Sequence, residues 1–372
     1  MTETSNPPLQ GYLPTLDGWR AVAILLVLLT HDRVHRVSQI STEAIHTSHG
    51  RGQGGVELFF CISGVLICTR LLEEERLNGT ICLKNFYLRR GFRIQPAAWV
   101  YLGFITVLMA TGVLTHAYDG IGYSLLMVRN YLPPHFSPRY WYTDHFWSLS
   151  VEEHFYLFLP LFLLVVRRRR VAMLVGLVLL LTLWTRFVGL HPALQFGWRL
   201  PLRTDFAAKQ LVLSSAIGVA LTKPAFRSWC RRRMLPFAAL PVAAALFWLA
   251  AWHIGEATAS VALCAYPLLV VSTLLHPESV PGKMLEWAPV RWVGRISYSI
   301  YLWQMPFFPF FYPVATSHSH LLVLLSQTWL RYPTVLGLSL MSYYWIEKPF
   351  IRIGHQLAKS AVPGRGETSA SR

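Results

Sequence analysis

The sequence is short of charge. Only 14% of its 372 residues are Asp, Glu, Lys or Arg, while 53% are hydrophobic. A soluble domain usually carries about 25% charged residues. This scarcity argues against a water-soluble enzyme or binding module, and the long apolar runs indicate the alternative. The composition predicts an all-α polytopic membrane protein.

Cysteine and acidic residues are also few. The 5 cysteines show no metal-site spacing, and none lies in a loop that we expect outside, which argues against a disulfide framework. Against 18 acidic residues stand 34 Lys and Arg, arranged in short runs between apolar segments. Such runs set membrane topology and bind anionic headgroups. We therefore expect membrane lipids as partners and no nucleic acid.

Apolar segments that could form membrane helices recur along the chain. We expect about ten transmembrane helices, at residues 16–33, 54–72, 95–114, 145–166, 171–190, 206–222, 235–253, 258–275, 292–312 and 321–346. Basic connections follow alternate spans, for example at 167–170 and 231–233. The positive-inside rule then predicts an N-in and C-in protein.

The ends of the chain differ from the apolar middle. A polar tail at 1–15 and a basic tail at 351–372 flank the expected transmembrane domain at 16–350. We expect disorder in the first tail and from about residue 356. No Lys or Arg precedes Arg20, so an ordinary signal peptide with a basic n-region is not expected.

Polar residues close both ends of the first apolar run. Arg20 and His31 are eleven positions apart, so on one helix they point to nearly the same face, about 16 Å apart. With the N-terminus inside, Arg20 lies near the cytoplasmic end and His31 in the outer half of the span. Arg20 could also snorkel to lipid phosphate, and His31 could cap a helix end.

Carboxylates are expected at the level of His31. Glu57 lies near the outer end of span 54–72, and Glu152 and Glu153 lie in the outer half of span 145–166. Intramembrane ionisable groups usually face a cavity and one another. A neutral imidazole with a carboxylate on its far nitrogen is a general base near neutral pH. A structural pair with an arginine is the alternative for Glu57 and Glu153.

A basic cluster lies on the opposite side of the membrane. The stretch KNFYLRRGFRIQP places Arg89, Arg90 and Arg93 just before span 95–114, and the last two are i, i+3 on one helical face. Arginine forks suit phosphate oxygens, although a positive-inside anchor also explains the cluster. Together with His31, the arrangement suits an anionic cytoplasmic donor and an acceptor outside.

Six stretches resemble the acyltransferase-3 family of integral membrane O-acyltransferases. In family order they are LDGWRAVAILLVLLTH, GGVELFFCISGVLI, FYLRRGFRIQP, HFWSLSVEEHFYL, RISYSIYLWQMP and WIEKPF. The resemblance implies about ten helices in the bacterial inner membrane. It also implies transfer of an acyl group, often acetyl, from coenzyme A to a hydroxyl of a glycan, lipid-linked sugar or small glycoside.

The resemblance also implies site residues. The family's R-x10-H signature falls on Arg20 and His31, with the histidine catalytic, and its arginine motif falls on Arg90 and Arg93. Glu57 stands where the family commonly has Asp, and Gln304 stands where many members have histidine. No soluble esterase-like domain is expected after the last span, so the chain resembles the stand-alone form.

These observations combine into one hypothesis. Acyl-CoA is the expected donor, and acetyl-CoA is its first candidate. Arg90 and Arg93 hold the donor, and Arg20 lies near the thioester or pyrophosphate. Arg89 and Ser63 are further donor-binding candidates. His31 activates the acceptor hydroxyl or carries the acyl group briefly.

The hypothesis also includes a carboxylate that orients His31, and it has alternatives. Glu57 or Glu153 is expected to fix the tautomer of the imidazole. A zinc site at His31 and His35 is the weaker reading, because no H-E-x-x-H frame exists, and no metal is expected. The rival function is a proton-coupled transporter that uses the buried His, Glu and Arg groups. A purely structural protein would have little reason to keep ionisable residues at one depth.

Overall fold

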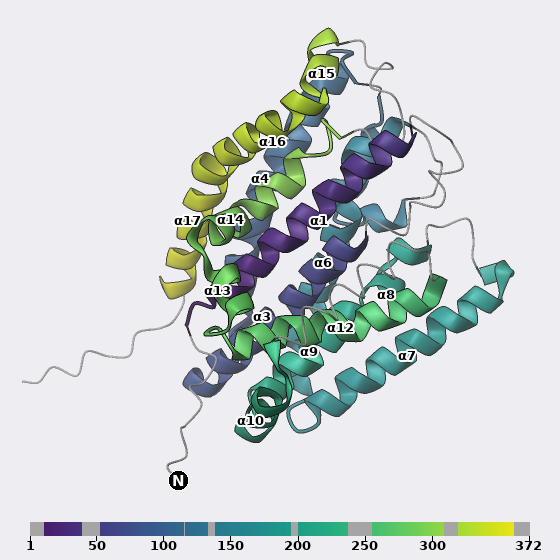
Figure 1. Cartoon of the computed structure of the whole chain (residues 1–372). Helices are drawn as coiled ribbons and strands as arrows, with labels where there is room; N and C mark the ends of the chain where they lie inside the picture. The colour runs from purple at the N-terminus through teal and green to yellow at the C-terminus, as the bar shows by residue number, and fades with distance from the viewer. Residues whose placement is uncertain are drawn as a thin grey trace, which may run out of the picture.

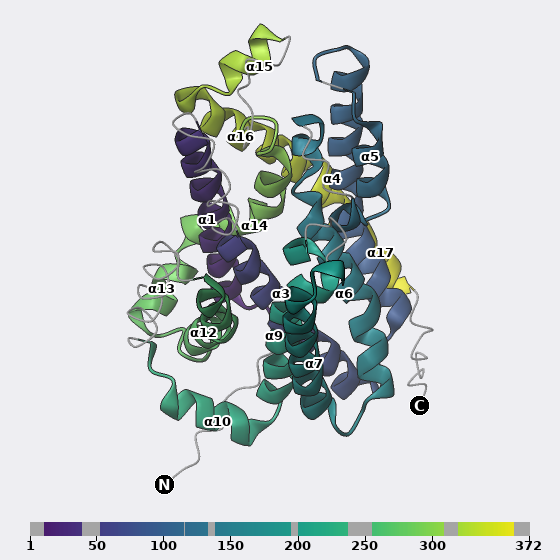
Figure 2. The same cartoon turned by 90° about the vertical axis from the view of Figure 1, so that its right-hand side faces the viewer.

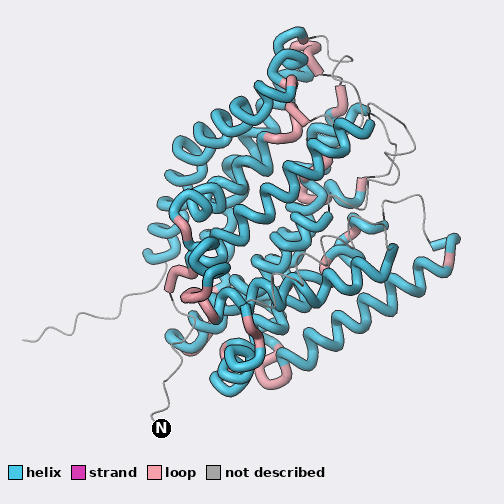
Figure 3. Tube along the Cα trace, viewed as in Figure 1, coloured by secondary structure: helices cyan, strands magenta, loops and turns pink. Residues whose placement is uncertain are grey.

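The structure, a computed structural model, is mainly helical in its described part, with loops and turns between the helices (Figure 3). The described residues are 11–38, 53–114, 116–132, 138–194, 200–236, 255–308 and 319–360. Within these ranges no strand occurs. The prediction of an all-α protein is therefore confirmed for the described chain.

Long helices form the body of the fold (Figure 1). They are α1 (Pro14–Ser38), α3 (Gln53–Asn78), α4 (Leu83–Ala110), α6 (Phe146–Val165), α7 (Arg170–Leu190), α9 (Lys209–Leu221), α12 (Gly255–Leu275), α14 (Ala288–Trp303), α16 (Thr328–Ser342) and α17 (Lys348–Ser360). Short helices connect them: α5 (Tyr118–Leu125), α8 (Thr204–Ala207), α10 (Pro224–Arg233), α13 (Val280–Glu286) and α15 (His320–Leu325).

The long apolar helices account for part of the predicted topology. In the described part, α3, α4, α6 and α7 are long and apolar enough to cross a membrane, and the α12–α13 pair, bent by 88°, allows a fifth span. Helix α1 has the length but carries Asp17, Arg20, His31 and Asp32. The span expected at 235–253 lies almost wholly outside the described residues. Ten spans and the N-in, C-in orientation stay predictions.

Helix α1 packs beside α3 and α14 (Figures 1 and 2). Gly294 of α14 meets it so closely that a Cβ there would lie 1.8 Å from the carbonyl oxygen of Asp17. Small residues allow helices in membranes to approach to this distance. Gly64 plays the same part between α3 and α9, where a Cβ would lie 2.6 Å from the carbonyl oxygen of Leu211.

Burial divides the long helices into central and peripheral ones. In the most apolar stretch of α3, 67% of the residues are buried inside the protein, against 17% in α7. Helix α7 lies at the edge of the bundle (Figure 1). Its exposed apolar side chains are therefore suited to contact with lipid. Most of the polar groups described below lie on α1, α3, α4, α6 and α14, and none lies on α7.

Two boundaries differ from those expected. Helix α4 begins at Leu83, so the arginine motif lies inside the helix, which continues through Pro96; membrane helices tolerate proline where neighbours compensate the lost hydrogen bond. Residues 361–372 lie outside the described residues, but the disorder expected from about residue 356 is wrong up to Ser360, because the chain to that residue belongs to α17. It is held on α4, where Phe350 stacks on Phe92.

Candidate active site

Helix α1 links two groups of polar residues. It is continuous from Pro14 to Ser38, so Arg20 and His31 lie about 16 Å apart along one helix and point to nearly the same side. We call the residues around Arg20 the arginine cluster and those around His31 the histidine cluster. Helices α1, α6 and α14 contribute to both.

The arginine cluster gathers three guanidinium groups from two helices. Arg20 of α1 has Arg90 and Arg93 of α4 as electrostatic neighbours, and Asp17 lies one turn before it, with 3.4 Å between Oδ1 and the Arg20 Nη1. The Arg20 side chain is 15% exposed. The structure thus brings together the three arginines that the sequence placed at the donor side.

Helix α6 supplies the opposing groups. The Glu152 carboxylate accepts a hydrogen bond of 2.8 Å from the Ser63 hydroxyl of α3. One turn on, the Tyr156 hydroxyl lies 3.4 Å from the same Ser63 oxygen, and the Arg90 guanidinium covers the Tyr156 ring at 5.1 Å. Ser63 therefore joins the cluster by way of Glu152.

Glu347 is a member of the arginine cluster that the sequence interpretation did not single out. It ends the π-helical turn Tyr343–Glu347, which joins α16 to α17. Its carboxylate accepts a hydrogen bond from Ser299 of α14 and lies near Arg93. Single π turns of this kind are frequent at functional sites. The signal in the sequence was an acidic residue at the end of an apolar segment, in WIEKPF.

Glu153 and Arg89 lie beside the cluster with other neighbours. Glu153 has Glu152 and Arg90 as electrostatic neighbours. Arg89 forms an ion pair of 2.8 Å with Glu74. Burial lowers the pKa of His355 on the adjoining α17, and the positive charges of Arg89 and Arg93 lower it further. The pKa of this histidine therefore depends on the positive charge of the arginine motif.

The histidine cluster is built where α1, α6 and α14 approach one another. His31 lies beside Gln304, the C-cap residue of α14, and has Asp144 as an electrostatic neighbour. His145, the N-cap residue of α6, has His31 as a neighbour as well. Gln304 is fully buried. The amide that replaces the family's commoner histidine thus lies against the candidate base.

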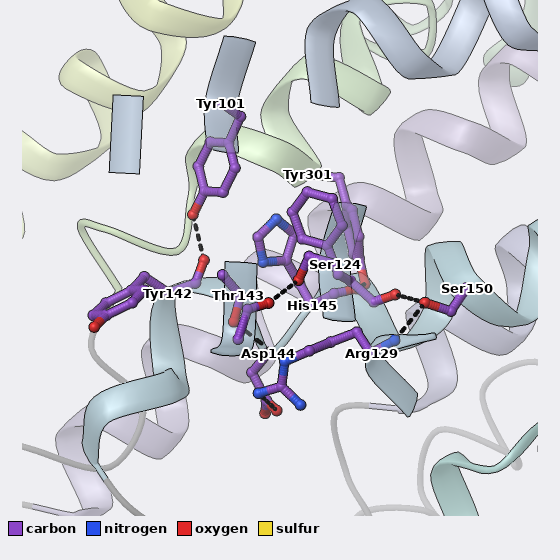
Figure 4. A network of polar contacts seen from close by, with 11 residues as sticks. Tyr101, Ser124, Arg129, Tyr142, Thr143, Asp144, His145, Ser150 and Tyr301 are labelled. Carbon is purple, nitrogen blue, oxygen red and sulfur yellow. Dashed lines mark hydrogen bonds and ion pairs between the residues drawn. The ribbon is translucent and has the colours of Figure 1, made fainter. Parts of the chain in front are cut away.

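Asp144 and His145 belong to a network that the sequence interpretation missed (Figure 4). Asp144 pairs with Arg129 at 3.3 Å, and the backbone N–H of Arg129 donates to Ser150 of α6 at 3.1 Å. The His145 ring lies among aromatic rings, 5.2 Å from the centroid of Tyr101 and 5.5 Å from that of Tyr301. The sequence signal was the pair of polar residues that precedes FWSLSVEE.

Polar groups on α6 connect the two clusters. Ser148, Glu152 and Tyr156 recur every four residues, so they share one face of the helix. The Ser148 hydroxyl lies 2.6 Å from the Tyr301 hydroxyl, and Tyr301 also has Glu152 as an electrostatic neighbour. A column of polar side chains therefore leads from the arginines to the histidines.

A buried ion pair lies next to His31 on the chain. Arg331 of α16 is fully buried, and its Nη2 donates to the Asp32 carboxylate of α1. The Arg331 guanidinium lies over the Phe308 ring at 4.9 Å. This pair fixes α16 against the end of α1 that carries His31.

The structure places Glu57 away from α1. Gly55 faces α1, where a Cβ would lie 2.7 Å from the carbonyl oxygen of Ala23, and a residue two positions on points about 200° away. The electrostatic neighbours of Glu57 are instead Lys209 of α9 and Tyr266 of α12. The structure thus brings neither Glu57 nor Glu153 to His31; Gln304, Asp144 and His145 lie there.

Among the described residues, no group of three or more His, Cys, Asp or Glu side chains is arranged to hold a metal ion. The side chain of His35 lies outside the described residues. The groups at the level of His31 are imidazoles, hydroxyls, an amide and the Asp144 carboxylate, and those at the level of Arg20 are arginine forks with carboxylates beside them.

Comparison with known proteins finds related enzymes by sequence. The chain is 28% identical over 343 residues to the peptidoglycan O-acetyltransferase OatA of Listeria monocytogenes, which covers 82% of this chain and 50% of that protein. It is 26% identical over 332 residues to the O-acetyltransferase OatA of Staphylococcus aureus, covering 80% and 51%. The chain spans about half the length of these curated relatives. No solved structure matches.

The helices and the two buried polar clusters define the class first: an α-helical protein with several membrane-capable spans around an ionisable centre. The chain belongs to the acyltransferase-3 family, whose model, described as an acyltransferase domain, matches residues 13–347. The resemblance read from the six sequence stretches is thereby confirmed.

Proposed function

We propose that this protein is an O-acyltransferase of the bacterial inner membrane. It moves an acyl group from cytoplasmic acyl-CoA to a hydroxyl of a cell-envelope glycan, and acetyl is the first candidate for that group. The observation that carries the proposal is the column of polar side chains between Arg20 and His31. It offers an anion-binding end and an imidazole end within one bundle. The peptidoglycan O-acetyltransferase relative makes a peptidoglycan sugar the first acceptor to try.

The donor contacts follow from the charges. Arg20, Arg90 and Arg93 present fixed positive charge to phosphate oxygens, for which arginine forks are suited. The carboxylates of Glu152 and Glu347 are each engaged by a serine hydroxyl, so they orient the cluster without blocking its donors. Arg89 is left out of the donor contacts, because its ion pair with Glu74 is closer, at 2.8 Å, than the 3.4 Å between Arg20 and Asp17.

Catalysis is assigned to the histidine cluster. The donor's thiol-bearing arm extends along the polar column, so that the thioester reaches His31. The imidazole takes the proton of the acceptor hydroxyl as the oxygen attacks the acyl carbon. A short-lived acyl-imidazole on His31 is the second route through the same residue. Gln304 and Asp144 orient the ring.

Binding of acetyl-CoA to the purified chain in detergent tests the donor site. The variant combines Arg90→Ala with Arg93→Ala, and a matched control combines Arg167→Ala with Arg168→Ala. The control removes the same charge from an exposed loop between α6 and α7. We expect the first double variant to lose binding and the control to bind as the wild type does.

The outcomes separate the rival functions. If both double variants lose binding equally, general positive charge rather than the arginine cluster holds the donor. If the wild type binds no acetyl-CoA and transfers no acyl group, the acyltransferase proposal fails. Proton or solute flux in proteoliposomes would then support the transporter.

A further inference from the structure

The imidazole ring of His145 is buried with its polar atoms unsatisfied among the described residues. The residue is 3% exposed, and neither its Nδ1 nor its Nε2 has a hydrogen-bond partner among the described residues. An unsatisfied buried polar group costs about 1–3 kcal/mol. Two such atoms on one ring therefore require an explanation, which ordered water or a ligand group could supply.

The surroundings of the ring are apolar on its faces and fixed in position. The rings of Tyr101, Phe146 and Tyr301 lie 5.2, 4.9 and 5.5 Å from it, centroid to centroid, all in T-shaped contact (Figure 4). The backbone carbonyl of His145 also accepts a hydrogen bond from the Tyr301 hydroxyl at 3.1 Å. The aromatic side chains thus hold the ring while leaving its nitrogens free.

The electrostatic setting favours an uncharged ring. Asp144, the carboxylate nearest in the chain, is engaged by Arg129 at 3.3 Å. A charged imidazolium without its own anion is costly in an aromatic, water-poor site. A neutral imidazole offers one N–H donor and one acceptor nitrogen. Neutral imidazole can polarise a carbonyl group as a hydrogen-bond donor.

His145 is also placed at the reacting level. It is an electrostatic neighbour of His31, and Tyr301, which touches it, precedes Gln304 by one turn of α14. Two imidazoles, one from α1 and one from the N-cap of α6, therefore lie near one another. One of them has neighbours that orient it as a base, and the other has two unused nitrogens.

We propose that His145 is a second catalytic residue, whose N–H donates to the carbonyl oxygen of the transferred acyl group. This rests on the proposed acyl transfer. As the acceptor oxygen bonds to the acyl carbon, its O–H proton passes to His31 and the carbonyl electron pair moves onto the oxygen that His145 holds. When the carbonyl re-forms, the C–S bond breaks and the thiolate leaves with the proton from His31. The second His145 nitrogen accepts from a hydroxyl of the acceptor.

The test compares the same substitution at two histidines of α6. His145→Phe fills the aromatic site and removes both free nitrogens, so stability is expected to hold or rise. Turnover is expected to fall about 10²–10³-fold, the usual loss when one oxyanion donor is removed. Binding of acetyl-CoA should change less than twofold.

The matched control is His154→Phe. The His154 Nδ1 has a hydrogen bond of 2.7 Å with Thr204, so this variant should melt at a lower temperature but keep its turnover within about threefold. His145→Gln returns an amide N–H near the position of Nε2 and should recover at least tenfold of the turnover lost in H145F.

Each outcome decides the proposal. Turnover by H145F within fivefold of the wild type overturns it, and so does H145Q that is no more active than H145F. If H145F does not fold, His145→Leu takes its place in the same comparison. A wild type without transfer activity defeats the proposed function itself, whereas an active wild type with an active H145F defeats this inference alone.

Discussion

The arginine cluster and the histidine cluster share helices α1, α6 and α14 but differ in the polar groups that they leave available. Around Arg20, charged residues face one another, and two carboxylates are held by serine hydroxyls. Around His31, an amide, imidazoles and tyrosine hydroxyls lie beside the Asp144–Arg129 and Asp32–Arg331 ion pairs, and His145 keeps both nitrogens free among the described residues. Fixed charge suits the binding of an anion, whereas neutral donors and acceptors suit the passing of a proton.

The comparison implies that binding and turnover can be lost separately. His31→Ala should lower acyl transfer by about 10²–10⁴-fold, because the general base is removed. Binding of acetyl-CoA should persist, because the arginine cluster is intact. Transfer and binding are measured on the same purified sample. Near-normal turnover, or a parallel loss of donor binding, would show that the two clusters do not divide the work in this way.

The second prediction concerns the support of the histidine cluster. Arg331→Met leaves Asp32 buried without its counter-charge, so stability should fall by about 3–5 kcal/mol. The double replacement Asp32→Leu with Arg331→Met should recover most of that loss, since a buried ion pair can be exchanged for apolar groups at little cost. Thermal melting in one detergent provides the measurement. A double variant as unstable as the single one would contradict the pairing.

The third prediction concerns a negative charge beside the arginine cluster. Glu153→Gln removes a negative charge beside Arg90, so the anionic donor should bind a few-fold more tightly, with a steeper dependence on salt. Glu73→Gln is the matched control, because Glu73 pairs with Arg76 at the surface. Weaker donor binding in E153Q would mean that Glu153 orients the arginines rather than opposing the donor.

The smallest effect is expected from metal removal. Because the proposed steps use only side chains, a strong chelator should change the rate of transfer less than twofold. Transfer is measured before and after dialysis against the chelator, with re-added Zn²⁺ as the control. A rate that collapses and returns with zinc would favour the weaker metal reading of His31.

The sequence predicted what depends on one helix and missed what depends on packing. Helical periodicity places Arg20 and His31 on one face of α1, and the i, i+3 spacing places Arg90 and Arg93 on one face of α4, whereas the roles of these residues were taken from the family resemblance. Asp144 and His145 could not be assigned, because their meeting with His31 depends on how α6 and α14 approach α1. Glu57 was expected at His31 from its depth alone, but the close contact at Gly55 turns it toward Lys209. A sequence indicates how deep a residue lies along its span, but it does not indicate which side of a helix faces its neighbour.

The eleven-residue gap between Arg20 and His31 has a consequence for how the chain can vary. Inserting one residue there would turn His31 by about 100° and move it about 1.5 Å, away from Gln304. An insertion of four residues, about one turn, brings His31 back to within about 40° of its present facing, and it lengthens the gap by about 6 Å. The distance can therefore not drift by small steps. Gaps in alignments with relatives should fall outside this stretch, even where substitutions within it are frequent.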